Sequence, residues 1–396
     1  MHTVFENVGA IAISTLMLVS VAAAQAQKAA QGQGAAQSRN IVTIDRLVAH
    51  ASTVPAVKGQ RVDLFVREDA LRVQSGASFN GRAVLMVHGG YSPGVLAFDV
   101  PYRDYSWAEF LAREGYDVFV MDMTGYGRSS RPMMDDPCNL ARNFQKMLIP
   151  KTLKEACEPN YKFELVNSDS ETDDINAVVD YIRKLRAVDK INVIGWSGGG
   201  IRLGTFVSRY QEKVGKFVIL ASSNYSRKNP DERPAELPRA GAPATIQSRE
   251  AGIDQRWLGT SKCADSIEPG MPEYIWGLNS EHDPLGATWG SGGLRAPTRT
   301  YWGWNANAAR KITVPTLVMV GEQDELMRSN LELIDDLGAS NKVFLSIACA
   351  THFVVWEKQR RILYRASLSW LRGARLNGSN SGSFRADERG AIVAKK

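Results

Sequence analysis

The chain has 396 residues, of which 44% are hydrophobic, and this composition is typical of a globular protein with a sizeable core. That length allows one large α/β domain with insertions or two modest domains. The formal net charge is +6, but Lys and Arg are scattered along the chain, which argues against a nucleic-acid partner.

The N-terminal segment is predicted to be a signal peptide. Residues 8–24 form an uncharged, mostly apolar run, and an Ala-Gln-Ala sequence at 24–26 offers a cleavage site. No Lys or Arg precedes the run, so a misassigned start, an uncleaved anchor and a buried helix stay open as alternatives. We expect a signal at 1–26, a flexible Gln/Ala/Gly-rich linker at 27–40, and a periplasmic or secreted protein. No other segment approaches the roughly 18 apolar residues that a membrane span needs.

The four cysteines fit an exported protein, because an even count is typical of disulfide frameworks there. Cys138 and Cys157 flank a short irregular stretch, so a local bridge between them is plausible. Cys263 and Cys349 are candidates for a long-range bridge. The alternative is buried free thiols that serve as small apolar side chains.

From residue 82 onward, short apolar runs alternate with amphipathic stretches. Strands are expected within residues 82–90, 116–130, 191–195, 216–223, 312–324 and 342–348. Helices are expected over residues 106–115, 168–190, 199–210, 330–337 and 353–372. This alternation predicts an α/β fold with a mostly parallel sheet and helices on both faces.

The alternation breaks between residues 224 and 310, where the chain is rich in Pro, Gly and Trp. So long a segment without sheet alternation predicts an inserted lid rather than a loop. The core is therefore expected to comprise residues 41–223 and 311–373, with a smaller insertion at 131–161. The polar tail, 374–396, is expected to be disordered.

One serine stands among four glycines in the sequence Gly-Trp-Ser-Gly-Gly-Gly at 195–200. The pattern Gly195-x-Ser197-x-Gly199 follows a predicted strand and precedes a predicted helix, which is the context of a nucleophile elbow. The glycines remove side chains that would clash in so sharp a turn. Ser197 is therefore the candidate nucleophile; the alternative is an incidental serine in a glycine-rich turn.

A nucleophilic serine needs a general base, and the chain has five histidines. His2 lies in the predicted signal peptide and His50 in a weakly patterned region. His88 ends a predicted strand, where it is expected to orient the loop that follows. His352 directly follows the last predicted strand and is the candidate base, with His282 as a weaker rival.

The base needs an acid to orient it. Asp324 also follows a predicted strand directly and is the candidate, with Glu322 and Glu325 in reserve. A helix cap is the alternative role for Asp324, and simple packing is the alternative for His352. The chain order Ser197, Asp324, His352 is the one expected with this elbow, and all three fall at the carboxyl ends of predicted parallel strands.

Acyl transfer also needs N–H donors for the oxyanion. Gly198, directly after the nucleophile, supplies one candidate. The sequence His-Gly-Gly-Tyr at 88–91 offers Gly90 or Tyr91 as the second.

With these residues assembled, the chain resembles the α/β-hydrolase superfamily, over roughly residues 61–372 outside the lid. The matching motifs are His-Gly-Gly at 88–90, Asp122-x-x-Gly125-x-Gly127-x-Ser129, Gly-Trp-Ser-Gly-Gly at 195–199, Gly321-x-x-Asp324 and His352. The resemblance implies an α/β-hydrolase fold with a lid after the sixth strand, and two-step acyl transfer on an ester. It implies no metal or organic cofactor. A peptidase or amidase of the same fold and a non-catalytic ligand-binding protein remain alternatives.

The lid holds five of the nine tryptophans, which suggests a small-molecule ester with an apolar or aromatic group. The candidate substrate-binding residues are Trp196, Trp276, Trp302 and Trp304. The last three could equally build the core of the lid. Glu273 and Asp283 could bind a substrate amine, as an aminopeptidase requires, but we expect them to be surface charges.

Overall fold

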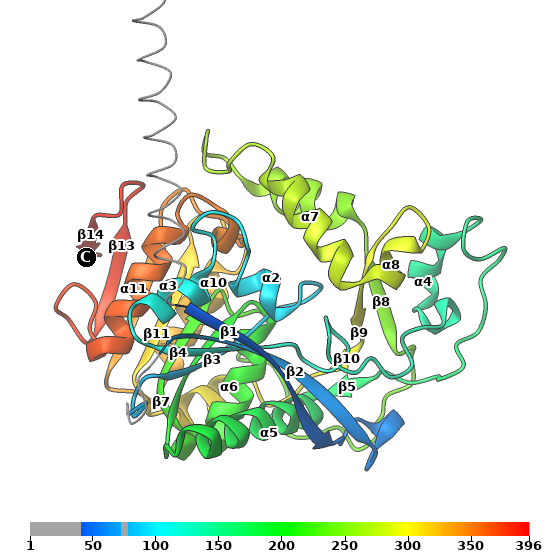
Figure 1. The fold of residues 1–396 in the computed structure, drawn as a ribbon, viewed down its shortest axis with the longest axis horizontal. Helices are drawn as coiled ribbons and strands as arrows, with labels where there is room; N and C mark the ends of the chain where they lie inside the picture. Colours follow the sequence, from blue (N-terminus) through cyan, green and yellow to red (C-terminus); the bar gives the residue numbers. More distant parts are fainter. Residues whose placement is uncertain (1–40, 73–77, 396) are drawn as a thin grey trace, which may run out of the picture.

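The computed structural model describes residues 41–72 and 78–395, so the predicted signal peptide and linker lie outside the described residues. A ten-stranded sheet runs through the molecule (Figure 1), in the order β1-β2-β4-β3-β6-β7-β11-β12-β13-β14. The strands are β1 (Ile41–Ala51), β2 (Arg61–Leu71), β3 (Ala83–Val87), β4 (Asp117–Met121), β6 (Ile191–Trp196), β7 (Val214–Leu220), β11 (Thr316–Gly321), β12 (Lys342–Ile347), β13 (Gly382–Ala386) and β14 (Ile392–Ala394). From β4 to β13 neighbouring strands run parallel, whereas β1, β2 and β14 pair antiparallel with their neighbours.

The central parallel strands are mostly apolar because helices cover the sheet on both faces (Figure 1). Every residue of β3, β4, β6 and β11 is buried. The helices around the sheet include α3 (Trp107–Arg113), α5 (Ser168–Arg186), α6 (Gly198–Tyr210), α9 (Ala306–Lys311), α10 (Met327–Asp336) and α11 (Arg360–Gly373). In the described part of the chain, no helix is long and apolar enough to cross a membrane.

Two parts of the sheet were not expected from the sequence. The antiparallel strands β1 and β2 precede the first predicted strand, and the tail expected to be disordered forms β13 and β14. The expectation for the tail is wrong because β13 pairs in parallel register with β12, from Val343 opposite Gly382 to Ile347 opposite Ala386. Pairing buries Phe384, which is a gain that the short polar segment cannot obtain alone.

The segment 224–310 follows β7, the sixth strand of the sheet along the chain. It contains β8 (Ala244–Gln247) paired antiparallel with β9 (Leu294–Pro297), together with α7 (Met271–His282) and α8 (Pro284–Thr288). These elements stand beside α4 (Arg142–Gln145) on one side of the molecule (Figure 1). A second, smaller hydrophobic core joins the segment to the insertion at 131–161. That core includes Met134, Leu140, Leu148, Ile246 and Trp289.

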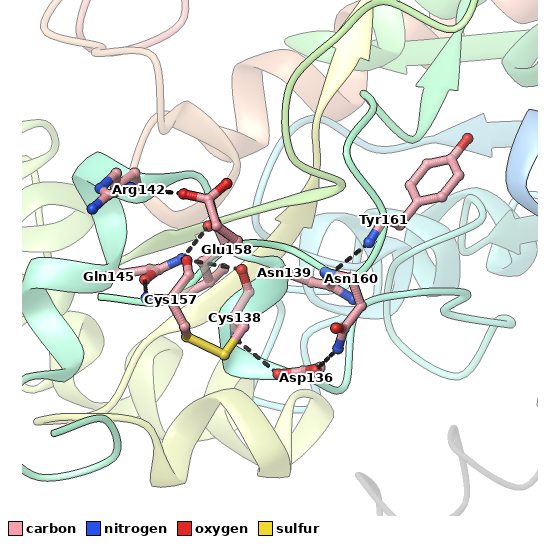
Figure 2. The surroundings of a disulfide bond; sticks show 10 residues. Asp136, Cys138, Asn139, Arg142, Gln145, Cys157, Glu158, Asn160 and Tyr161 are labelled. Carbon is pink, nitrogen blue, oxygen red and sulfur yellow. Dashed lines mark hydrogen bonds and ion pairs between the residues drawn. A yellow bond between two sulfur atoms is a disulfide. The ribbon is translucent and has the colours of Figure 1, made fainter. Parts of the chain in front are cut away.

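The insertion at 131–161 is fastened by the disulfide between Cys138 and Cys157, whose Cα atoms lie 5.3 Å apart (Figure 2). The side chain of Gln145 lies inside the same loop and bonds to both cysteines. Its Nε2 donates to the carbonyl oxygens of Cys138 and Cys157, both at 3.0 Å, and its Oε1 accepts from the Cys157 N–H at 2.9 Å. A buried amide thus satisfies backbone groups that have no regular secondary structure to pair with.

Candidate active site

Ser197 lies on the turn between β6 and α6, with φ 56° and ψ −117°. A non-glycine residue at positive φ is strained, so the surrounding packing has to hold it there. A methyl group at Gly195 would lie 2.6 Å from the carbonyl oxygen of Gly199, and one at Gly199 would lie 1.9 Å from that of Val87. The turn therefore requires glycine at both positions.

The structure brings together the three side chains predicted to form a triad. His352 Nε2 lies 2.8 Å from Ser197 Oγ, and His352 Nδ1 lies 2.8 Å from Asp324 Oδ2. All three side chains are buried. Ser197 follows β6, Asp324 follows β11 and His352 follows β12, so each lies beyond the carboxyl end of a parallel strand.

The rival residues are engaged elsewhere. Glu322 forms an ion pair with Arg385 at 2.8 Å. Glu325 pairs with Arg256 at 3.3 Å. His282 Nδ1 lies 3.0 Å from the carbonyl oxygen of Leu278 in its own helix. Asp324 does not cap the following helix, α10, whose N-cap is Leu326; its second oxygen, Oδ1, accepts from the Leu326 N–H at 2.9 Å in the turn before that helix.

The loop after β3 passes directly over Ser197. A methyl group at Gly89 would lie 2.7 Å from Ser197 Cβ, so only glycine allows this approach. His88 orients the loop from within the core: its Nδ1 lies 2.8 Å from Gly89 O and its Nε2 accepts from the Met123 N–H at 3.1 Å. Complete burial lowers the pKa of His88 to about 3, so the ring is neutral with its proton on Nδ1.

Sequence reasoning missed a buried charge cluster under this loop. Arg202 of α6 donates from Nη1 to the carbonyl oxygens of His88 at 2.5 Å and Gly89 at 3.0 Å. Its Nε donates to Glu171 of α5 at 2.8 Å, and Arg299 Nε lies 3.2 Å from the same carboxylate oxygen. Burial raises the pKa of Glu171, and the two guanidinium groups compensate its charge. Nothing in the local sequence of α6 distinguishes Arg202 from an ordinary helix arginine.

The loop that carries His352 is held from two sides. The second disulfide joins Cys349 to Cys263 of the segment 224–310, with Cα atoms 5.5 Å apart. On the other side, the buried carboxylate of Glu357 accepts from the N–H and the hydroxyl of Thr351. Glu357 was also absent from the predicted site, because its role depends on a loop that curls back over six residues.

A small cavity of about 30 Å³ lies above Ser197 and His352. Its walls are mainly aromatic and are formed by Trp196, Trp276, Phe353 and Trp356. Its roof comes from the segment 224–310 and includes Gln247, Ile253, Arg256, Asn279 and Leu294. Such a volume holds roughly one or two water molecules.

The predicted substrate-binding tryptophans divide into two groups. Trp196 and Trp276 line the cavity, and Trp196 Nε1 also donates to the His352 carbonyl oxygen at 3.0 Å. Trp302 and Trp304 do not line it. Both are buried elsewhere, and Trp304 Nε1 donates to Ser222 Oγ at 3.1 Å. Trp304 belongs to the main hydrophobic core and packs against Gly204 of α6, so it does not build a separate core of the lid either.

Neither acid considered for amine binding lines the cavity. Glu273 forms an exposed ion pair with Arg249 at 3.0 Å. The expectation that Asp283 is a surface charge is wrong. Its side chain is buried between Arg131 and Arg295, each 2.7 Å away. These two arginines lower the pKa of Asp283 against the opposing effect of burial.

Among the described residues, one group has the spacing of a metal site: Cys263, Cys349 and Glu388. Its two sulfur atoms form a disulfide, so no thiolate is free there to bind an ion.

A serine on a sharp strand-to-helix turn of a parallel sheet, bonded to a histidine and an aspartate, defines the α/β-hydrolase class of fold. The chain belongs to this family: the model of the alpha/beta hydrolase fold matches residues 82–359. The resemblance noted in the sequence and the predicted fold class are thus confirmed, and family membership supports a hydrolase. No curated protein matches the chain in sequence.

Several solved structures are similar to this chain. A putative lipase from Sulfolobus solfataricus is 18% identical with a TM-score of 0.50, covering 85% of this chain and 95% of that one. An esterase from Thermogutta terrifontis is 16% identical with a TM-score of 0.48, covering 84% of this chain and 100% of that one. A serine hydrolase involved in carbazole degradation is also 16% identical with a TM-score of 0.48, covering 84% and 99%. At such identities the likeness concerns the fold alone.

Proposed function

We propose that this protein is a serine hydrolase that cleaves carboxylic esters through a covalent acyl-enzyme. The observation that carries the proposal is the continuous hydrogen-bond chain from Ser197 through His352 to Asp324, with 2.8 Å at each step. A binding protein gains nothing from a base and an acid aligned on a strained serine, so this chain favours catalysis over ligand binding.

The reaction follows from these distances. His352 Nε2 takes the proton of Ser197 Oγ as that oxygen attacks the ester carbonyl carbon. Asp324 holds the imidazole through Nδ1 and stabilises the imidazolium. His352 then returns the proton to the departing alcohol, and a water molecule hydrolyses the acyl-enzyme by the same route.

The oxyanion needs two N–H groups above Ser197. Gly198 is the first residue of α6, so its N–H has no acceptor within the helix, and the helix dipole favours negative charge there. Between the two further candidates, Gly90 is preferred because Tyr91 does not line the cavity. Gly90 lines the cavity beside Ser197.

The preferred substrate is a small ester with an apolar or aromatic group. The aromatic walls Trp196, Trp276, Phe353 and Trp356 support this preference. The segment 224–310 acts as a lid in this proposal, since its side chains form the roof of the cavity. An aminopeptidase has no support, because Glu273 and Asp283 are paired with arginines outside the cavity.

We further propose export of the protein after removal of residues 1–26. The apolar run at 8–24 and the two disulfides support an oxidising compartment.

The test uses residues 27–396 and the release of p-nitrophenol from acetate, butyrate, octanoate and palmitate esters. Wild type should turn over the shorter esters, and Ser197→Ala should fall to background, because the variant lacks the nucleophile. Hydrolysis that survives Ser197→Ala, or no hydrolysis of any ester by wild type, would overturn the proposal.

A further inference from the structure

The cavity above Ser197 contains one permanently charged side chain. Arg256, from the segment 224–310, is the only arginine or lysine that lines it among the described residues, and no carboxylate lines it. Its guanidinium carbon lies 5.8 Å from the centroid of the Phe353 ring, next to the proposed base. A positive charge thus borders a cavity whose walls are mainly aromatic.

The present partner of Arg256 is weakly held. Nη2 lies 3.3 Å from Glu325 Oε1, and the Glu325 side chain is 63% exposed while that of Arg256 is 38% exposed. Ion pairs of this kind contribute about 0–1 kcal/mol, since water and salt screen them. An anion inside the cavity, where fewer water molecules compete, attracts the guanidinium more strongly than Glu325 does.

A second polar group of the roof is unpartnered. Asn279 is 2% exposed and lines the cavity. Its Nδ2 donates to the Ile275 carbonyl oxygen at 2.9 Å, whereas its Oδ1 has no hydrogen-bond partner. A buried acceptor without a donor is costly, which indicates that a polar ligand group or water completes it. An ionised carboxylate only accepts hydrogen bonds, so the donor to Asn279 Oδ1 is a water molecule or a hydroxyl or N–H group elsewhere on the ligand.

We propose that the natural substrate is an ester that carries a carboxylate in its acyl or alcohol part, and that Arg256 binds this carboxylate in place of Glu325. This inference rests on the proposed ester hydrolysis. The planar guanidinium can present two N–H groups to a carboxylate, so it selects for the anion and not merely for polarity. Arg256 is then a specificity residue, and Ser197, His352 and Asp324 perform the chemistry.

The test compares acid and neutral esters of equal length. The acyl arm uses mono-p-nitrophenyl adipate against its methyl ester, and the alcohol arm uses 3-carboxyphenyl butyrate against phenyl butyrate. In at least one arm, wild type should favour the acid ester by about tenfold or more in kcat/KM, mainly through KM. Arg256→Gln should bring that ratio close to one, and Arg256→Lys should keep part of it.

The matched control is Arg249→Gln. Arg249 belongs to the same segment but pairs with Asp254 and Glu273 and does not line the cavity. This variant should keep the wild-type ratio. An equal preference for acid and neutral esters in both arms, or the same loss in both variants, would overturn the inference while leaving ester hydrolysis intact.

A binding measurement separates this inference from the proposed reaction. In Ser197→Ala, calorimetry should show that the acid ester of the favoured arm binds at least tenfold more tightly than the neutral one. The difference should vanish when Arg256→Gln is added. If no ester is hydrolysed by wild type, the reaction is wrong, and equal binding of both esters would reject the role of Arg256 as well.

Discussion

The buried carboxylate of Glu357 accepts hydrogen bonds from both the N–H and the hydroxyl of Thr351, at 3.0 and 2.5 Å. Thr351 directly precedes His352, so this contact sets the direction from which the imidazole approaches Ser197. Trp257 Nε1 donates to the same carboxylate at 3.0 Å, which ties the segment 224–310 to the loop.

Glu357→Gln should therefore impair catalysis more than binding. The new amide brings N–H donors against the donors of Thr351 or Trp257, and the loop has to shift. We expect kcat for a good ester to fall roughly tenfold with little change in KM, and the free energy of unfolding to fall by about 1–3 kcal/mol. Glu332→Gln, in a largely exposed pair with Arg328, is the control and should change neither. A wild-type kcat in Glu357→Gln would show that the loop is positioned by other contacts.

Arg202→Lys tests whether Arg202 holds the loop after β3, which carries the proposed oxyanion donor Gly90. Lysine keeps the positive charge beside Glu171 but cannot also donate to the carbonyl oxygens of His88 and Gly89 in the same fork geometry. Loosening this loop should misplace the Gly90 N–H, so kcat should fall by about tenfold to a hundredfold, within what loss of one oxyanion donor costs. Steady-state kinetics on p-nitrophenyl butyrate measure the kcat of the variant. A fall in the free energy of unfolding without a fall in kcat would assign Arg202 to folding alone.

The two disulfides should separate stability from activity. Cys263 and Cys349 are 86 residues apart in sequence, and Cys138 and Cys157 are 19 apart. Loop entropy predicts a loss of about 3–5 kcal/mol for either bridge, larger for the longer loop. Replacement of Cys263 and Cys349 by serine should also lower kcat at temperatures where the chain stays folded, because Cys349 lies three residues before His352.

Replacement of Cys138 and Cys157 by serine is the matched control. This bridge lies in the insertion at 131–161 and neither cysteine lines the cavity, so kcat should stay at the wild-type value. Thermal unfolding and ester kinetics on both double variants check this. Equal kcat in the two variants would contradict a role of the Cys263–Cys349 bridge in holding the His352 loop.

Asp174 makes the stability depend on pH. Burial raises its pKa to about 7, and its nearest basic group is His50, with 3.6 Å between His50 Nε2 and Asp174 Oδ1. An unfolded Asp loses its proton near pH 4, at about 3.9. Between roughly pH 4 and 7 the folded chain therefore binds more protons, so this contribution to stability is present at low pH and lost as pH rises through 7.

Asp174→Asn should remove that dependence, because the amide does not titrate. The difference in free energy of unfolding between variant and wild type should shift in favour of the variant by a few kcal/mol, at most about 4, from pH 4.5 to pH 8. Urea unfolding at the two pH values measures it. Asp169→Asn changes a partly exposed acid on the same helix, which pairs with Arg209, and should keep the wild-type dependence of unfolding free energy on pH. A slope unchanged by Asp174→Asn would mean that the carboxyl is ionised throughout.

The sequence by itself determined the class of fold and pointed to three side chains that the structure brings together, Ser197, His352 and Asp324. Both are written in local patterns: apolar runs that suit buried strands, glycines that suit a strained turn, and polar residues directly after strands. It also suggested the two cysteine pairs that the structure joins, with free thiols as the alternative.

Only the tertiary structure decided what surrounds these residues. The approach of Arg202 to the His88 loop, the pairing of β13 with β12, and the choice of Trp276 over Trp304 as a cavity wall all join elements distant in the chain. Periodicity shows which face of an element is buried, but not which partner covers it, because the partner is set by packing of the whole sheet. The proposed role of Arg256 depends on the tertiary structure for the same reason, because only the folded chain places its charge at the cavity.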